Sequence, residues 1–293
     1  MLTLQRILVA NDLSPRAEKA LTRAMQLAVE HRATLTVLHV MEERAQDETE
    51  IQQMTEKIAE ALRQQTERFT PHPSGAVTTQ VVTGKPFVEI IRRAREQTVD
   101  LIVVGAHGEH FLKDLFVGTT AEKIARKGDR PVLVVKQAPQ SPYQRVLVAV
   151  DFSESSRHAL EFALQLAPKA EFHVLHAYEG FEGRLIVGGA SESEIARYRR
   201  HLAKEARQEM IAFLHDSGCT GKAVHHLLRH GRAPYIITKV AKRLHADLVA
   251  VGTTGRTGLP YILLGSVAEH VLREVNCDVL VVRRPETVHF ELP

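Results

Sequence analysis

The chain has 293 residues, of which 44% are hydrophobic and 25% charged, with a formal net charge of +3. These proportions are those of a soluble globular protein long enough for two domains, and they exclude a disordered chain. The small basic excess is interleaved with acids, which argues against a nucleic-acid partner. No apolar run approaches the ~18 residues of a membrane span, and the two cysteines make no disulfide framework. We therefore expect a cytoplasmic protein with no membrane partner.

The first half alternates predicted strands and helices. Strands are expected near residues 5–11, 33–40, 77–83, 100–105 and 131–136, and helices near 14–32, 48–69, 86–97 and 119–128. Ser14 followed by Pro15 predicts a helix start, because the hydroxyl caps the helix and proline needs no N–H there. The helix near 48–69 carries one apolar stripe, which Gln65 interrupts.

Two continuous apolar runs, 101–104 and 132–135, predict strands that are covered on both faces. The second half repeats this pattern. QRILVANDLS at 5–14 returns as QRVLVAVDFS at 144–153, and DLIVVGAHG at 100–108 returns as DLVAVGTTG at 247–255. We infer an α/β protein of two repeated domains, 1–138 and 144–293, joined by a linker at 139–143.

The second copy contains extra residues between its second and third strands, which we assign to 179–191. This glycine-containing stretch predicts a longer loop. It is either a surface excursion or a lid or partner contact.

A glycine-rich loop follows the fourth strand of each copy and leads into a helix. Both loops fit G-x2-G-x9-G-[S/T], with Gly105 to Thr119 in the first copy and Gly252 to Ser266 in the second. A helix start presents unpaired N–H groups and a partial positive charge, and glycine lets a phosphate approach the backbone. Thr119 and Ser266 are expected to add a hydroxyl donor and to cap the helix. A single glycine turn of this kind is often only structural.

An acid closes the first strand of each copy, Asp12 and Asp151. Ligands of open parallel sheets bind beyond the strand ends where the strand order reverses. There the carboxylate would hold a base amine, a ribose hydroxyl or a divalent ion. The alternative is that each Asp only caps a helix.

Both halves resemble the universal stress protein family in the glycine signature, the acid after strand one and the Val-Leu-His type of second strand. The resemblance implies an adenine-nucleotide α-hydrolase-like, Rossmann-like fold. It predicts two tandem open parallel sheets, each five-stranded in the order 3-2-1-4-5, with helices on both faces. It also implies that the fifth strands, 132–135 and 279–282, join the two copies. Whether two chains form a homodimer stays open.

The resemblance further implies that ATP or ADP, with or without Mg²⁺, binds in each half. The first implied site comprises Asp12, Val40, Gly105, Gly108, Gly118, Thr119 and Thr120. The second comprises Asp151, Ala177, Gly252, Gly255, Arg256, Gly265, Ser266 and Val267. The second loop has the Arg-Thr-Gly stretch typical of nucleotide-binding members, whereas the first has Glu109 and His110, so the second site is the stronger prediction.

No P-loop, nucleophile elbow or kinase motif is present in the sequence. We therefore predict a non-enzymatic nucleotide-binding regulatory protein of the stress response. The alternatives are a structural or interaction module and a slow nucleotidase or self-phosphorylating protein. His225, His226 and His230 cluster in the sequence without firm metal-ligand spacing, so no metal site is predicted. His39 and His176 are expected to be packed or hydrogen-bonded at strand ends.

Overall fold

The computed structural model describes residues 4–42, 47–69, 71–106, 118–180, 187–219, 224–253 and 264–283. Strands and helices alternate along both halves, near the ranges that the sequence predicts. The first half consists of β1 (Arg6–Ala10), α1 (Pro15–His31), β2 (Thr34–Met41), α2 (Glu48–Glu67), β3 (Val77–Thr83), α3 (Pro86–Glu96), β4 (Leu101–Gly105), α4 (Thr119–Lys127) and β5 (Val132–Val135). The second consists of β6 (Arg145–Ala149), α5 (Glu154–Leu166), β7 (Glu171–Tyr178), α7 (Glu192–Asp216), β8 (Val224–His230), α8 (Ala233–Leu244), β9 (Leu248–Gly252), α9 (Ser266–Glu274) and β10 (Asp278–Val282).

All ten described strands form one sheet, in the order β3-β2-β1-β4-β5-β10-β9-β6-β7-β8. Each half keeps the predicted order 3-2-1-4-5, and its strands are parallel. The two predicted five-stranded sheets are one continuous sheet, because β5 and β10 pair antiparallel with Leu133 opposite Leu280, which confirms the joining of the fifth strands that the family resemblance implies. Both strands are short, apolar and buried, and buried backbone groups at a sheet edge need hydrogen-bond partners. Pairing the two edges supplies those partners.

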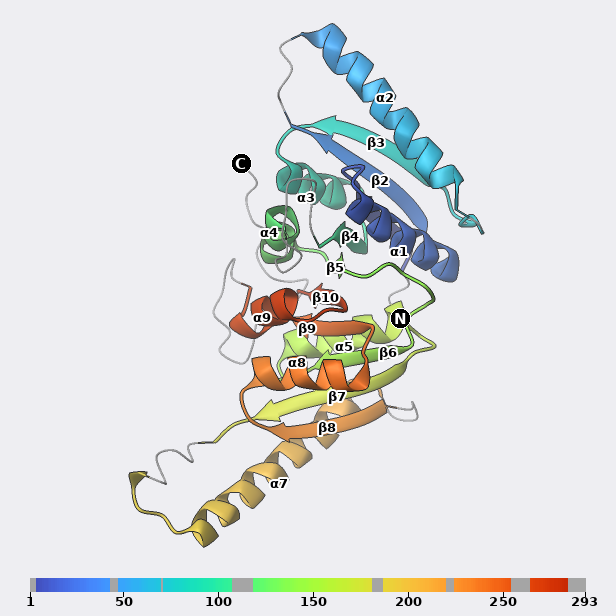
Figure 1. The fold of residues 1–293 in the computed structure, drawn as a ribbon. Coiled ribbons are helices and arrows are strands. Elements are labelled where there is room, and N and C mark those ends of the chain that lie inside the picture. The colour runs from blue at the N-terminus through green and yellow to red at the C-terminus, as the bar shows by residue number, and fades with distance from the viewer. Residues whose placement is uncertain are drawn as a thin grey trace.

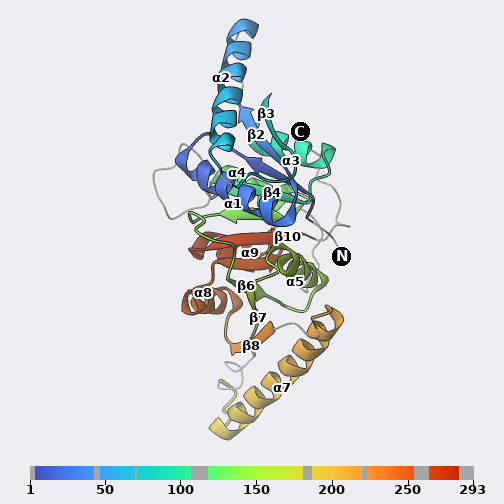
Figure 2. The same cartoon turned by 90° about the vertical axis from the view of Figure 1, so that its right-hand side faces the viewer.

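Helices cover both faces of the sheet, as Figures 1 and 2 show. One buried cluster lies under α1 and α5 and includes Leu62 of α2 and Met210 of α7. The other lies under α3, α4, α8 and α9. Each cluster contains residues of both halves, so the two hydrophobic cores continue across the β5–β10 junction. No helix among the described residues combines the length and apolarity needed to cross a bilayer.

The contacts between the halves are reciprocal. Glu122 and Arg126 of α4 pair with each other at 3.0 Å, and Glu269 and Arg273 of α9 pair at 2.9 Å. Crossed pairs join the helices, Arg126 to Glu269 at 3.8 Å and Arg273 to Glu122 at 3.4 Å. These four residues, which are corresponding pairs in the repeat, form a charge network with approximate two-fold symmetry.

Residues after β5 and β10 cap helices of the opposite half. Lys136 Nζ donates to the carbonyls of Leu272 and Val275 at the end of α9, both at 2.6 Å. Arg283, at the corresponding place after β10, donates to the carbonyl of Arg126 near the end of α4 at 2.5 Å. Cations at a helix C-terminus satisfy carbonyls that lack helical partners. Each half therefore completes a helix of the other.

Two long helices extend past the sheet at opposite ends of the molecule (Figures 1 and 2). The buried residues of the 20-residue α2 are Leu62 and Thr66, and those of the 25-residue α7 are Ala206, Met210 and Phe213. Both sets lie in the C-terminal half of their helix. The start of α7 has a capping box formed by Ser191 and Glu194. Of the stretch 179–191, for which a loop is predicted, residues 181–186 lie outside the described residues.

Candidate functional site

The carboxyl ends of β1 and β4 lie side by side, and so do those of β6 and β9. Val9 is opposite Val103 in the first half, and Ala149 is opposite Val251 in the second. From β1 the chain passes to β2 on one side, whereas from β4 it passes to β5 on the other. Each pair therefore forms a topological switch point, which is the usual ligand position in open parallel sheets.

An acid-bearing turn closes one side of each switch point. Asp12 Oδ1 accepts from the backbone N–H of Ser14 at 3.1 Å. Asp151 Oδ1 accepts from the N–H of Ser153 at 3.1 Å and from its hydroxyl at 2.5 Å. Ser14 and Ser153 cap α1 and α5, as the sequence predicts. Neither Asp is the helix cap, because each lies two residues before it and braces the turn.

The residue between acid and cap has a left-handed backbone in both halves. Leu13 and Phe152 each have φ 64°. A residue with a Cβ pays about 1–2 kcal/mol for this conformation, and such outliers persist only where the surroundings hold them. Because the left-handed residue directly follows the acid in both halves, we infer that this turn sets the position of the acid. Neither residue is glycine or asparagine, so the sequence contains no signal for the turn.

A helix N-terminus closes the other side of each switch point. Gly118 caps α4 and Gly265 caps α9, and neither cap has a side-chain hydrogen bond. The N–H of Gly118 donates to Ala106 O at 2.5 Å, and that of Gly265 to Thr253 O at 2.9 Å. Thr119 and Ser266 are the first helical residues and not the caps, so the prediction that their hydroxyls cap the helices is wrong. Among the described residues, neither helix has a hydrogen bond from a cap side chain to its first-turn amides.

Gly252 has a packing role as well as a place in the glycine signature. A Cβ at this position would lie 2.6 Å from Ser155 Oγ and 2.8 Å from its carbonyl carbon. Glycine at the end of β9 therefore allows α5 to approach the strand. Gly265 is less restricted, since a Cβ there would lie 3.1 Å from Thr253 O. The hydroxyl of Thr253 is buried and has no hydrogen-bond partner among the described residues.

The histidines of the second strands connect strand ends. His39 Nδ1 lies 2.8 Å from Asn11 O, and His176 Nδ1 lies 2.8 Å from Val150 O. This agrees with the hydrogen-bonded role predicted for both. Val40 and Ala177, the next residues, pair with Val82 and Arg229 at the ends of β2 and β7. Their backbone thus lies at the same edge of the sheet as the acid-bearing turns.

The structure places most of the predicted site residues at this edge. Those that it describes are Asp12, Val40, Gly105, Gly118, Thr119 and Thr120 in the first half, and Asp151, Ala177, Gly252, Gly265, Ser266 and Val267 in the second. Gly108, Gly255 and Arg256 lie outside the described residues, as do Glu109, His110 and Thr257.

The histidine cluster of the sequence separates in space. His225 and His226 are adjacent in β8, so their side chains point to opposite faces of the sheet. His225 instead stacks on His173 of β7 with ring centroids 5.0 Å apart, and both approach Glu171. Within the described ranges, no three His, Cys, Asp or Glu side chains are arranged to hold a metal ion.

The universal stress protein family model matches residues 3–136 and again residues 142–283. The chain belongs to the universal stress protein family. The universal stress protein E homolog of Haemophilus influenzae is 26% identical over 304 aligned positions, which cover 95% of this chain and 97% of that protein. A universal stress protein of Methanocaldococcus jannaschii is 31% identical over 144 positions, covering 49% of this chain and 84% of its own length.

Solved structures share the tandem fold of this universal stress protein. One from Archaeoglobus fulgidus has a TM-score of 0.70 at 23% identity, covering 97% of this chain and 100% of its own. A protein of unknown function from Pseudomonas aeruginosa has a TM-score of 0.65 at 25% identity, covering 97% and 94%. Both comparisons support the α/β architecture over the whole length of the chain.

Proposed function

We propose that this universal stress protein binds an adenine nucleotide, ATP or ADP, in each half and acts as a regulatory protein of the stress response. One observation carries the proposal. In each half an acid-bearing turn and a helix N-terminus that begins at a glycine cap flank the same switch point. The two halves share this arrangement although the side chains around it differ. Its recurrence favours a common ligand over a loop geometry that is only structural.

The phosphates would be held by the first turns of α4 and α9. The caps Gly118 and Gly265 offer no side chain to these amides and present no Cβ to an approaching oxygen. A helix N-terminus favours an anion by about 0.3–1 kcal/mol, and each charge-assisted hydrogen bond adds about 1.5–3 kcal/mol. A few such bonds and an adenine contact account for micromolar affinity, which corresponds to about 8 kcal/mol.

The remaining roles follow the positions of the residues around each switch point. Val40 and Ala177 would meet the adenine through their backbone. Asp12 and Asp151 would accept hydrogen bonds from the ribose or share an Mg²⁺ ion with the phosphates. Gly108, Gly255 and Arg256 would complete the loops. Arg256 adds a positive charge in the second loop where Glu109 adds a negative one in the first, so the second site is proposed to bind more tightly.

The test separates folding from binding by placing a carboxylate at the first helical residue. In Ser266→Asp and Thr119→Asp the acid stabilises the helix start but repels a phosphate. Wild-type protein is purified, denatured and analysed for released nucleotide by mass, beside both variants and Ser193→Asp. Ser193 is exposed in the first turn of α7, so that variant controls for a carboxylate added at the start of a helix.

We expect near-stoichiometric ATP or ADP from wild type and Ser193→Asp, and loss of most of it in Ser266→Asp. Thr119→Asp should remove a smaller share. Wild type that releases no nucleotide, and whose melting temperature millimolar Mg²⁺–ATP does not raise, would refute the proposal. The glycine loops would then be structural only.

The same measurements distinguish two alternative functions. As an interaction module it would release no nucleotide and use surfaces such as Val187, which is 90% exposed before α7. As a slow nucleotidase it would release ADP from ATP above the rate of Ser266→Asp. A homodimer, also left open by the sequence, would need another surface than β5 and β10, because these strands pair with each other.

A further inference from the structure

The strained turns beside Asp12 and Asp151 need support from the rest of each half. In the first half the support is an amide pair. Asn11 is 2% exposed, and its Oδ1 accepts from the N–H of Leu13 at 2.8 Å. Its Nδ2 donates to Gln65 Oε1 at 3.0 Å. Because the N–H of Leu13 requires an acceptor, the orientation of the Asn11 amide is determined, and Gln65 must offer its oxygen.

Gln65 belongs to α2, one turn after the buried Leu62. It is the residue that interrupts the apolar stripe of this helix in the sequence. Its hydrogen bond connects the base of the projecting helix to the residue before Asp12. A polar residue on a packed face is thus explained by the turn that it supports.

In the second half, aromatic side chains support the corresponding turn. Val150 stands where the first half has Asn11. The ring of Phe152 lies 4.1 Å from that of His176 and 5.5 Å from that of Phe213. Phe213 lies one turn after the buried Met210 of α7, as Gln65 follows Leu62 in α2. In both halves, a residue at the corresponding position of the projecting helix supports the same left-handed turn. The support is a hydrogen bond in the first half and a contact between aromatic rings in the second.

We propose that Asn11 and Gln65 are positioning residues of the first nucleotide site. They keep Leu13 in its left-handed conformation and thereby place the Asp12 carboxylate at the switch point. Phe152 and Phe213 do the same for Asp151. This inference rests on the proposed nucleotide binding. It also links each site to the helix that projects from its half, so a change at the acid-bearing turn reaches α2 through one hydrogen bond.

The test compares Asn11→Val and Gln65→Leu with two controls. Asn11→Val installs the residue that the second half carries at Val150, so folding is expected to tolerate it. Gln65→Glu keeps an oxygen that accepts from Asn11. Gln64→Leu changes an exposed neighbour on the same helix. Binding of Mg²⁺–ATP is measured by calorimetry in the Ser266→Asp background, which leaves the first site, and amide hydrogen exchange at Leu13 and Ser14 is measured by NMR.

We expect Asn11→Val and Gln65→Leu to weaken ATP binding about 3- to 30-fold, because the competent turn is populated for a smaller fraction of the time. Exchange at Leu13 should accelerate by a similar factor, whereas Gln65→Glu and Gln64→Leu should match the parent. The double variant should lose no more than Asn11→Val alone, since both changes remove one support. A merely structural role would lower the melting temperature without changing affinity.

Two failures are distinguishable. If wild-type protein binds no ATP in either half, the proposed function fails, and the role of Asn11 toward a nucleotide fails with it. If wild type binds ATP and the Ser266→Asp parent does not, the first half has no nucleotide site and the positioning role of Asn11 and Gln65 is overturned. If the parent binds ATP and Asn11→Val and Gln65→Leu bind it equally well, with unchanged exchange at Leu13, only the positioning role is overturned.

Discussion

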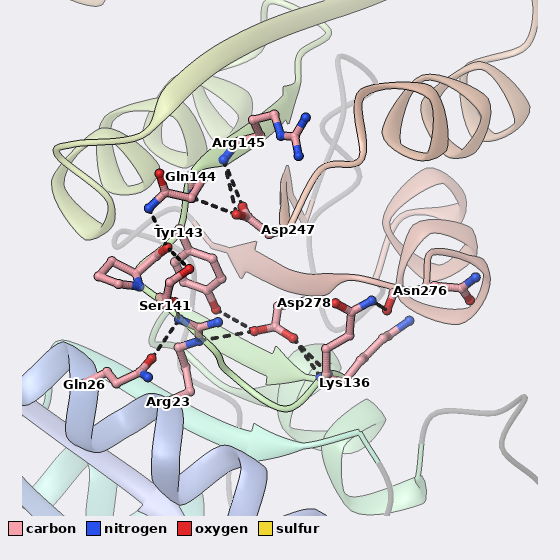
Figure 3. Close-up of polar contacts among 12 residues, drawn as sticks. Arg23, Gln26, Lys136, Ser141, Tyr143, Gln144, Arg145, Asp247, Asn276 and Asp278 are labelled. Carbon is pink, nitrogen blue, oxygen red and sulfur yellow. Dashed lines mark hydrogen bonds and ion pairs between the residues drawn. The ribbon is translucent and has the colours of Figure 1, made fainter. Parts of the chain in front are cut away.

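The phenol of Tyr143 donates a 2.7 Å hydrogen bond to Oδ2 of Asp278, and both side chains are buried. Tyr143 precedes β6, and Asp278 begins β10. Figure 3 shows that Arg23 of α1 points at the same carboxylate, and Arg23 Nε lies 3.5 Å from Oδ2. The backbone N–H of Lys136, at the end of β5, donates to Oδ1 at 2.9 Å. One carboxylate thus joins both halves and the segment between them.

Removing the phenol should destabilise the protein. Tyr143→Phe leaves a buried carboxylate with one hydrogen bond fewer, which costs about 1–3 kcal/mol. Burial already raises the pKa of Asp278, so little solvent is present to replace the lost donor. Urea unfolding measures the change, and Tyr235→Phe, at a residue that is 62% exposed, serves as the control. Equal stabilities of the two variants would contradict the role of Tyr143.

Removing the carboxylate should cost more than removing the phenol. Asp278→Ala leaves the guanidinium of Arg23, 6% exposed, without its ion-pair partner. Breaking a buried pair in this way typically costs about 3–5 kcal/mol. Arg23→Met with Asp278→Ala should recover part of the loss in the same unfolding experiment, because no charge then stays buried alone. No recovery in the double variant would mean that the ion pair is not the source of the cost.

Stability should rise as the pH increases from about 8 to 9. Burial lowers the pKa of Lys136 from 10.5 to about 8. In this range the unfolded chain holds a proton that the folded chain has released, so the free energy of unfolding increases with pH by up to about 1 kcal/mol. Lys136→Met should remove the rise, as measured by urea unfolding at pH 7.5 and 9.

Above pH 9 the buried thiol of Cys277 acts in the opposite direction. Burial raises its pKa from 9.0 to about 12, so the unfolded chain releases a proton that the folded chain keeps. Between about pH 9 and 10.5 the two effects offset each other, so the stability of wild type should level off there and fall only above 10.5, where the Lys136 gain is complete. Cys277→Ala should instead keep rising up to about pH 10.5. Equal slopes for wild type and Lys136→Met below pH 9 would refute the assignment.

Acid should destabilise wild type more than a His173→Thr variant. Burial lowers the pKa of His173 from 6.5, against the attraction of Glu171 and with the repulsion of His225. As the pH falls through 6.5 the unfolded chain binds a proton that the folded chain resists, so stability is lost. Threonine is the residue at the corresponding place, Thr36, in the first half. Unfolding free energies of the two proteins at pH 7 and 5 should diverge, and parallel slopes would contradict the prediction.

Gly252→Ala should destabilise the second half whether or not a nucleotide binds. The added Cβ would lie 2.8 Å and 2.9 Å from the carbonyl carbon and oxygen of Ser155, and overpacking of this kind costs about 1–3 kcal/mol. Shortening the side chain with Ser155→Ala cannot relieve a backbone clash. Gly265→Ala, where the nearest atom is 3.1 Å away, should cost less in the same melting experiment. The reverse order of the two losses would exclude this packing role.

Local patterns in the sequence predicted the helices and strands and their succession along each half of the chain. The apolar runs at 101–104 and 132–135 are buried strands, and Ser14 with Pro15 begins a helix as its chemistry requires. Because the pattern recurs in the second half, each copy supported the assignment of elements in the other. These features depend on neighbours within a few residues, so they can be read from the chain without knowing what each segment contacts.

The sequence by itself determined the α/β repeat, the strand order through its family resemblance and the positions of the acids and glycines. Only the tertiary structure decided the antiparallel register in which β5 and β10 pair, the contact of Gln65 with Asn11 across 54 residues, and the left-handed backbone of Leu13 and Phe152. It also separated His225 from His226 by the pleat of β8. Such pairings form between residues distant in sequence, and a strained backbone persists only where packing holds it, so neither leaves a local pattern to read.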